Sequence, residues 1–229
     1  MTTSGTYNFN PSNGEIVLNA FARCGIRRTA LVQEHMQDAR MEMNLMLSEW
    51  SNRGVNLWEV TFVEQALTAG TSTYSVNANT VMILDAFIRT STGESQYDRV
   101  IMPISRTEYS ATPNKNLQAP PTVFWFDRLI SPTVTVWPVP NQDGLTLGYY
   151  AVTQIQDANY DNGQTLNVPY RWLDAASSGL AARLAAIYAP DRLTFLGPRA
   201  EQAWTIAATQ DVENVPTYII PGISGYYRT

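Results

Sequence analysis

Residues Thr29–Phe62 read T-A-L-V-Q-E-H-M-Q-D-A-R-M-E-M-N-L-M-L-S-E-W-S-N-R-G-V-N-L-W-E-V-T-F, and the rest of the chain can be placed around them. Apolar residues recur at steps of three and four from Met36 to Trp50, which is typical of one face of an α-helix. We predict a helix over Ala30–Arg53 that Thr29 caps and that Gly54 ends in a left-handed turn. At 1.5 Å per residue this helix is about 36 Å long, so its apolar face needs partners.

After Gly54 the apolar residues recur at every second position instead of at steps of three and four. Trp58, Val60 and Phe62 alternate with Glu59 and Thr61, which predicts a half-buried strand. Shorter apolar runs separated by turn residues follow, with one helical turn at 106–110. The predicted strands cover 73–76, 81–89, 97–104, 122–126, 133–137 and 145–153. Six or seven strands with short links favour a small antiparallel sheet or sandwich.

Helical patterns flank this β section on both sides. The tetrapeptide Ser12-Asn13-Gly14-Glu15 has the form of a capping box and predicts a short helix that ends at Gly25. A later helix follows Val168-Pro169-Tyr170 and ends before Pro190, and a last one starts at Gly197-Pro198 and fades by Asn214. Asp191–Leu196 is either a separate helical turn or part of the last helix.

This order predicts an α+β fold. Two N-terminal and two C-terminal helices form a four-helix bundle over 12–54 plus 168–214, and an antiparallel β domain is inserted at 55–167. Residues 1–11 are predicted to be a flexible N-terminal arm.

The C-terminal segment 215–229 reads V-P-T-Y-I-I-P-G-I-S-G-Y-Y-R-T. Its prolines and glycines prevent a long helix, yet it is rich in apolar and aromatic residues, which disordered tails normally lack. The segment either folds back over its own sheet or reaches a partner by strand addition or groove filling, and we favour the partner. The residues predicted to contact a partner or neighbouring subunit are Pro216, Tyr218, Ile219, Ile220, Ile223, Tyr226 and Tyr227.

Charge is scarce and unevenly distributed. Only 15% of the 229 residues are charged, well below the usual quarter, and such a surface suits a subunit of an assembly. The net charge is −5, and residues 55–169 carry five bases against ten acids. This argues against a grip on nucleic acid through clustered Lys and Arg, but not against a surface past which DNA slides.

The sequence offers no catalytic or metal site. Cys24 and His35 are the only residues of their types, so a zinc site is not expected. A catalytic triad would depend on His35, which is better explained as a surface or packed histidine. Glu42 and Glu49 could act as a carboxylate pair on a glycan, but such pairs are common on solvated helices. We therefore predict a protein that is not an enzyme and has no cofactor.

The chain resembles the head-to-tail connector family of short-tailed bacteriophages, also described as adaptor, tail accessory factor, packaged-DNA stabilisation protein or tubular protein A. The resemblance covers about residues 12–214. It lies in the motifs M-N-L-M-L-S-E-W-S-N-R-G-V-N-L-W at 43–58, W-P-V-P at 137–140 and V-P-Y-R-W-L at 168–173, and in the strand at Tyr74.

The resemblance implies a virion protein at the head–tail junction, assembled in the host cytoplasm. Its implied partners are further copies of itself in a ring of twelve, the portal protein, and nozzle, tubular or tail-fibre proteins. Double-stranded DNA passes through the ring without specific binding, and no membrane is involved. In such a ring the long helix is expected to face the neighbouring subunit through Glu34, Arg40 and Glu42.

Two alternatives stay open. One is a glycan-binding or peptidoglycan-acting virion protein, motivated by the aromatic residues Trp125, Trp137, Tyr149 and Tyr150 in the β section. The other is a tail-completion protein of a long-tailed phage, which only the identity of its partner would distinguish.

Overall fold

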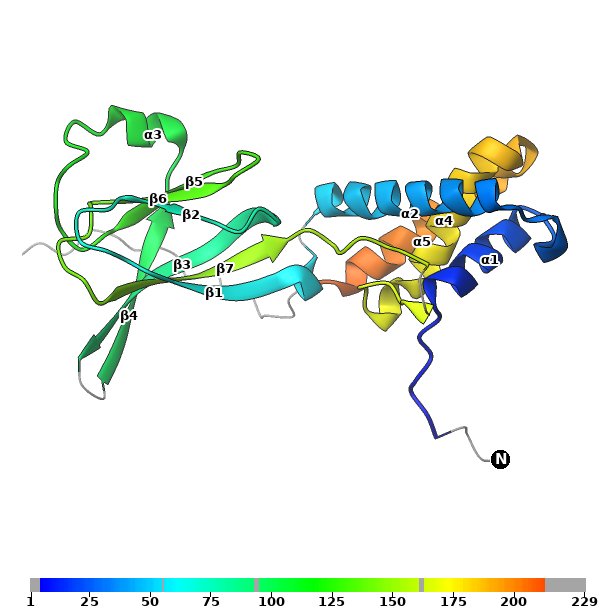
Figure 1. The fold of residues 1–229 in the computed structure, drawn as a ribbon, viewed down its shortest axis with the longest axis horizontal. Coiled ribbons are helices and arrows are strands. Elements are labelled where there is room, and N and C mark those ends of the chain that lie inside the picture. Colours follow the sequence, from blue (N-terminus) through cyan, green and yellow to red (C-terminus); the bar gives the residue numbers. More distant parts are fainter. Residues whose placement is uncertain (1–4, 55, 93–94, 161–162, 213–229) are drawn as a thin grey trace, which may run out of the picture.

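The computed structural model describes residues 5–54, 56–92, 95–160 and 163–212. Figure 1 shows an elongated molecule with its helices at one end and its sheet at the other. The larger helices are α1 (Asn13–Arg23), α2 (Gln33–Arg53), α4 (Leu173–Tyr188) and α5 (Leu193–Gln210), and α3 (Arg106–Ala111) is a short helix within the β section. Single 3-10 turns occur at Arg28–Ala30, Leu57–Glu59, Tyr170–Trp172 and Pro190–Arg192.

The β section is one curled sheet of seven strands (Figure 1). Its strands are β1 (Val60–Ala66), β2 (Thr73–Ser75), β3 (Thr80–Thr92), β4 (Ser95–Pro103), β5 (Val123–Asp127), β6 (Thr133–Trp137) and β7 (Leu145–Thr153). Their order across the sheet is β1-β7-β3-β4-β5-β6-β2.

The predicted α+β class and the run of strands are confirmed, but the sheet is not wholly antiparallel. β4 and β5 pair in parallel through Met102 with Val123 and Pro103 with Phe124. The chain between these two strands contains α3 and a long loop, and this connection is long enough to bring β5 back in the same direction as β4.

The core of the helical end is organised around α4, which contacts α1, α2 and α5. Its small residues Ala175, Ala176, Ser177 and Ser178 are buried. A Cβ on the neighbouring Gly179 would lie 2.7 Å from Met46 Sδ of α2, so the glycine makes room for the α2 side chain. The helices thus share a core through α4, whereas their arrangement as a four-helix bundle stays a prediction.

A second core lies within the curl of the sheet. Its buried side chains come from every strand except β1, which adds only the partly buried Val63, and β7 contributes Leu145, Leu147, Tyr149 and Ala151 at alternate positions. This period of two follows from the alternation of side chains along a strand.

The first helix forms as predicted. Ser12 caps α1 in a capping box with Glu15, and the helix stops before Gly25, whose φ of +80° is left-handed. Such a backbone suits glycine because it has no Cβ to clash.

The predicted ends of the long helix are wrong. Arg28–Ala30 form a separate 3-10 turn, and α2 starts after Val32 rather than after Thr29. The Val32 N–H donates a hydrogen bond to His35 Nδ1 at 3.4 Å. Neither valine nor histidine is a usual capping residue, so the sequence did not indicate this start of the helix. At its other end Gly54 has φ 169° and ψ −171°, which is extended backbone and not the predicted left-handed turn.

The prediction of which side chains of the first strand point inward is also wrong. Trp58 belongs to a 3-10 turn packed against the helical core, and Glu59 rather than its neighbours is buried. Phe62 is exposed because it lies on the outer face of the sheet, which carries no layer of helices.

The last helix begins earlier than predicted. It starts at Leu193, directly after the 3-10 turn Pro190–Arg192, so Leu193–Leu196 belong to it. Pro198 lies inside α5 instead of at its start. Because proline has no N–H, it leaves one carbonyl of the preceding turn without its helical partner.

Candidate assembly surfaces

Four tryptophans pack together where the helical end meets the sheet. The Trp172 ring lies 5.0 Å from those of Trp50 and Trp58 and 6.4 Å from that of Trp204. These rings come from α2, α5 and the turns before β1 and α4. The cluster therefore fixes the sheet relative to the helices, and we call it the tryptophan junction.

Two buried carboxylates complete this junction. Asp211, directly after α5, is bound by Arg171 and by the Leu57 N–H at 3.2 Å. Glu59 accepts hydrogen bonds from Asn167 Nδ2 at 2.6 Å and from Thr153 Oγ1 at 3.1 Å. No cation among the described residues pairs with Glu59, and burial raises its pKa above the ordinary 4.5.

We expect Glu59 to make stability depend on pH. A carboxyl whose pKa is raised on folding contributes stability below its unfolded pKa, and this contribution is lost as the pH rises through the folded pKa. Relative to Glu59→Gln, the wild type should gain stability as the pH falls from 7 toward 4. Urea unfolding at several pH values measures this difference, and parallel curves would contradict it.

The control for this experiment is Glu59→Ala. Glutamine can still accept the hydrogen bond from Asn167, whereas alanine removes the acceptors of the hydrogen bonds from both Asn167 and Thr153. Glu59→Ala should therefore lose about 1–3 kcal/mol at every pH.

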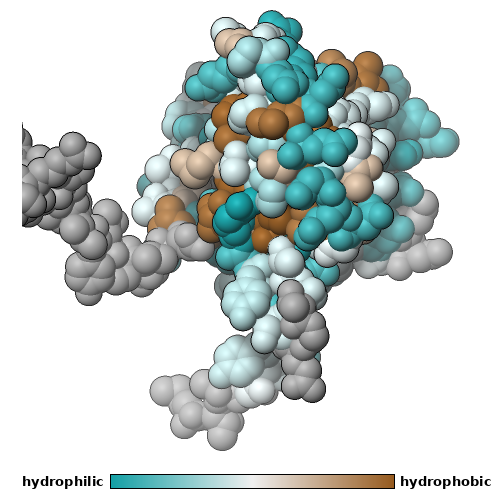
Figure 2. All heavy atoms as spheres, turned by 90° about the vertical axis from the view of Figure 1, so that its left-hand side faces the viewer, coloured by the Kyte–Doolittle hydropathy of each residue, from teal (hydrophilic) through white to brown (hydrophobic). Residues whose placement is uncertain are grey.

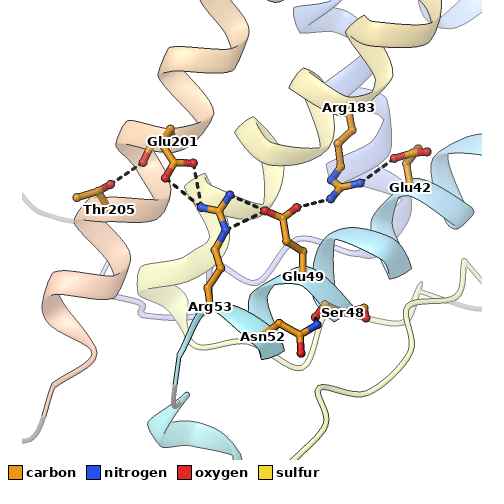
Figure 3. Close-up of polar contacts among 8 residues, drawn as sticks. All are labelled: Glu42, Ser48, Glu49, Asn52, Arg53, Arg183, Glu201 and Thr205. Carbon is orange, nitrogen blue, oxygen red and sulfur yellow. Dashed lines mark hydrogen bonds and ion pairs between the residues drawn. The ribbon is translucent and has the colours of Figure 1, made fainter.

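A chain of ion pairs crosses α2, α4 and α5 (Figure 3). Arg183 of α4 binds Glu42 at 3.0 Å and also binds Glu49. Arg53 binds Glu49 through its Nε at 2.8 Å and Glu201 of α5 at 2.9 Å. Its guanidinium also lies 4.7 Å from the Trp204 ring. The network thus holds the C-terminal end of α2 against the middle of α5.

This network leaves the carboxylate pair unsuited to glycan hydrolysis. Partial burial raises the pKa of Glu49, but hydrogen bonds from Arg53 and Arg183 outweigh it and hold the pKa below the ordinary value. A general acid in such a reaction needs a raised pKa. Glu42 and Glu49 are therefore best explained as ion-pair partners of Arg183.

The predicted subunit-facing residues of α2 do not lie together. Glu34 and Arg40 are exposed, whereas Glu42 turns toward α4 to bind Arg183. His35, the other residue considered for chemistry, packs against the rings of Phe21 and Tyr188, which also contact each other. The C-terminal residues from Pro216 to Tyr227 lie outside the described part of the chain.

The aromatic residues of the β section do not form a glycan-binding row. Tyr149 is buried in the sheet core, and its neighbour Tyr150 points to the opposite face beside Phe62. The Trp125 ring stacks on Tyr109 of α3 at 5.4 Å, and Trp137 Nε1 donates to the Asn114 carbonyl at 3.0 Å. Each ring thus has a separate packing role.

The outer face of the sheet carries an apolar strip that sequence analysis missed. The Phe62 ring contacts those of Phe87 and Tyr150, and Val100 lies opposite Phe87 in the register of β3 and β4. Arg89 crosses this strip and binds Asp98 at 2.9 Å. The sequence shows the alternation of apolar residues along β3 and β4, but this alternation does not indicate which face of the sheet other elements cover.

Further apolar groups lie at the β end of the molecule, gathered in the middle of that face with polar residues around them (Figure 2). Exposed apolar surface of this kind marks interaction sites. By contrast, no three His, Cys, Asp or Glu side chains of the described residues come together as metal ligands would. Nor is any described helix both long and apolar enough to cross a membrane.

Comparison with protein families gives one match that covers most of the chain. The family described as SU10 adaptor protein matches residues 17–217. No curated protein matches the chain. The matched range contains α2, α4 and α5, the whole sheet and the tryptophan junction.

Proposed function

The chain belongs to the SU10 adaptor protein family, whose members are phage head–tail adaptors, and from this premise we propose that its copies form a ring beneath the portal of the virion. The ring extends the DNA channel, helps to retain the packaged genome and provides the platform on which nozzle, tubular or tail-fibre proteins dock. The observation that carries this proposal is the family match over residues 17–217.

The division of the chain supports this role. The helical part (12–54 plus 168–214) forms the body of the ring, and the sheet inserted at 55–167 projects from it toward the tail. Residues 55–169 contain five basic and ten acidic residues, and this difference accounts for all of the net negative charge of the chain. An acidic lining would repel the phosphate backbone, so DNA would pass without binding.

The C-terminal segment 215–229 is the proposed arm to the portal. It follows α5, which ends at the tryptophan junction. Its apolar residues, from Tyr218 to Tyr227, need a surface to cover them, and a groove on a partner would supply it.

The experiment is reconstitution with the portal protein encoded by the same virus. Mixing the two should give a complex of fixed stoichiometry, and electron micrographs should show a closed ring of about twelve adaptor copies on one end of the portal. Binding to tail-tube proteins but not to the portal would identify a tail-completion protein instead. Chains that stay monomeric with either partner would refute an adaptor ring.

A further inference from the structure

A groove of about 550 Å³ lies between α1 and α4 on the helical part, and we call it the α1–α4 groove. Its lining includes Asn19, Arg23 and Ser177. Hydrogen bonds between the two helices hold this lining in place, since Ser177 Oγ donates to Asn19 Oδ1 at 2.8 Å and Arg23 Nη1 donates to Ser178 Oγ at 2.6 Å. The groove is therefore preformed, which lowers the cost of binding a segment in it.

One end of the groove lies where the described chain ends. Tyr170 and Arg171 line the groove at the tryptophan junction. Arg171 also binds Asp211, which directly follows α5. Val212 is the last described residue of the chain, and it is exposed. Residues 213–229 therefore start beside this end of the groove.

From this end the groove leads away from the sheet. α1 runs toward the far end of the helical part (Figure 1). Its residues Ile16, Asn19 and Arg23 line the groove at steps of three and four, as one face of a helix does. Arg28, in the turn after α1, lines the far end. In the proposed ring the sheet points toward the tail, so the groove leads toward the portal.

The segment that starts there is long enough to follow the groove and pass beyond it. α1 has 11 residues and is about 16 Å long. Residues 213–220 reach about 26 Å when they are fully extended. Residues 221–229 then remain for a contact with the portal.

The groove also carries apolar groups that suit the first half of the segment. Tyr170 is 74% exposed, and the apolar side chains of Ile16 and Leu173 line the groove beside it. The segment has its first apolar run at Tyr218–Ile220. Covering Tyr170 with this run would remove apolar surface of both from water.

We infer that residues 213–220 of each subunit lie in its own α1–α4 groove when the ring is bound to the portal. This inference rests on the proposed function and names the path by which the arm reaches the portal. α5 holds one end of the arm and the portal holds the other, so a weak contact with the groove becomes intramolecular. In the free chain nothing holds the far end, and the contact adds little to stability.

Engineered cysteines test this path. The only native cysteine, Cys24, is buried, so it is first replaced by Cys24→Ser. Pro11→Cys, at the tryptophan-junction end of the groove, is combined with Thr217→Cys, and the variant is assembled with the portal and treated with a short bis-maleimide cross-linker. Mass spectrometry of the single-chain band should find the two cysteine peptides joined. Arg28→Cys with Ile220→Cys should give the same result at the far end.

Two controls distinguish other positions of the segment. Val100→Cys, on the exposed face of the sheet, combined with Thr217→Cys should give no joined peptides. A product from this pair would place the segment on its own sheet and overturn the inference. Multimers from the Pro11→Cys and Thr217→Cys pair would also overturn it, because they would place the segment in the groove of a neighbour.

Portal affinity gives a second measurement. Tyr170→Ala should raise the Kd for the portal about tenfold, as the loss of one aromatic contact does in many interfaces. The matched variant is Tyr97→Ala, at an exposed tyrosine of β4, which should leave the Kd unchanged because the sheet points away from the portal. Equal Kd values for Tyr170→Ala and the wild type would overturn the proposed contact.

The inference and the proposed function fail in different ways. A portal complex that forms but gives no joined peptides with either groove pair overturns the inference alone. Absence of any complex with the portal overturns the proposed function, and the inference with it.

Discussion

Deletion of residues 215–229 is expected to abolish the complex with the portal while leaving the fold intact. The segment carries six large apolar or aromatic side chains, whose burial contributes on the order of 10 kcal/mol before the cost of ordering the chain. Even half of this value corresponds to more than about a thousandfold in Kd. Sedimentation of labelled adaptor with portal rings measures the loss.

The structure indicates why the truncated chain should fold. α5 ends at Gln210, and the contacts of Asp211 with Leu57 and Arg171 precede the deletion. Circular dichroism and the melting temperature of the truncated chain should therefore match those of the full chain. Deletion of residues 1–10 is the matched control and should leave portal binding unchanged. Undiminished binding by the chain that ends at residue 214 would contradict the role of the arm.

A finer variant separates side-chain burial from chain length. Ile219→Asp combined with Ile220→Asp keeps every backbone group of the arm but places two charges where burial is expected. Burying an unpaired charge is costly, so this variant should bind almost as weakly as the deletion. Tight binding by it would indicate that the arm acts only as a spacer.

Local signals in the sequence were sufficient to predict most of the helices and strands. The capping box at Ser12 and Glu15 fixed the start of α1, and the period-two runs gave β6 and β7 with their observed ends. These features depend on neighbours in sequence, so a single chain displays them. The change from helix to strand after α2 could be predicted in the same way, although Gly54 has an extended backbone there instead of the predicted left-handed turn.

Features that depend on distant contacts were not predictable. Phe62 looks buried by alternation, yet it lies on a face of the sheet that no other element covers, where Tyr150 of the neighbouring β7 is exposed as well. Glu42 looks like a surface residue, but Arg183, 141 positions away, draws it toward α4.

Replacement of Trp172 by alanine is expected to cause the largest loss of stability among single substitutions in the described chain. Its side chain is 2% exposed and fills the space between Trp50, Trp58 and Trp204. Removing a buried aromatic ring of this size costs about 3–5 kcal/mol, through lost burial and the cavity that remains. Chemical denaturation followed by far-UV circular dichroism measures the free energy of unfolding.

Trp172→Phe separates the packing of the ring from its polar group. The Trp172 Nε1–H finds no acceptor among the described residues, so phenylalanine loses volume but no hydrogen bond. It should therefore cost clearly less than alanine. Trp137→Ala, at a partly exposed ring of β6, should also cost less than Trp172→Ala. Equal losses for Trp172→Ala and Trp137→Ala would show that the tryptophan junction is no more important than an ordinary contact. A much larger loss of stability for Trp172→Ala would instead indicate that the packing of the sheet on the helices depends on this one ring. Three of the elements that meet at the tryptophan junction contact each other through it.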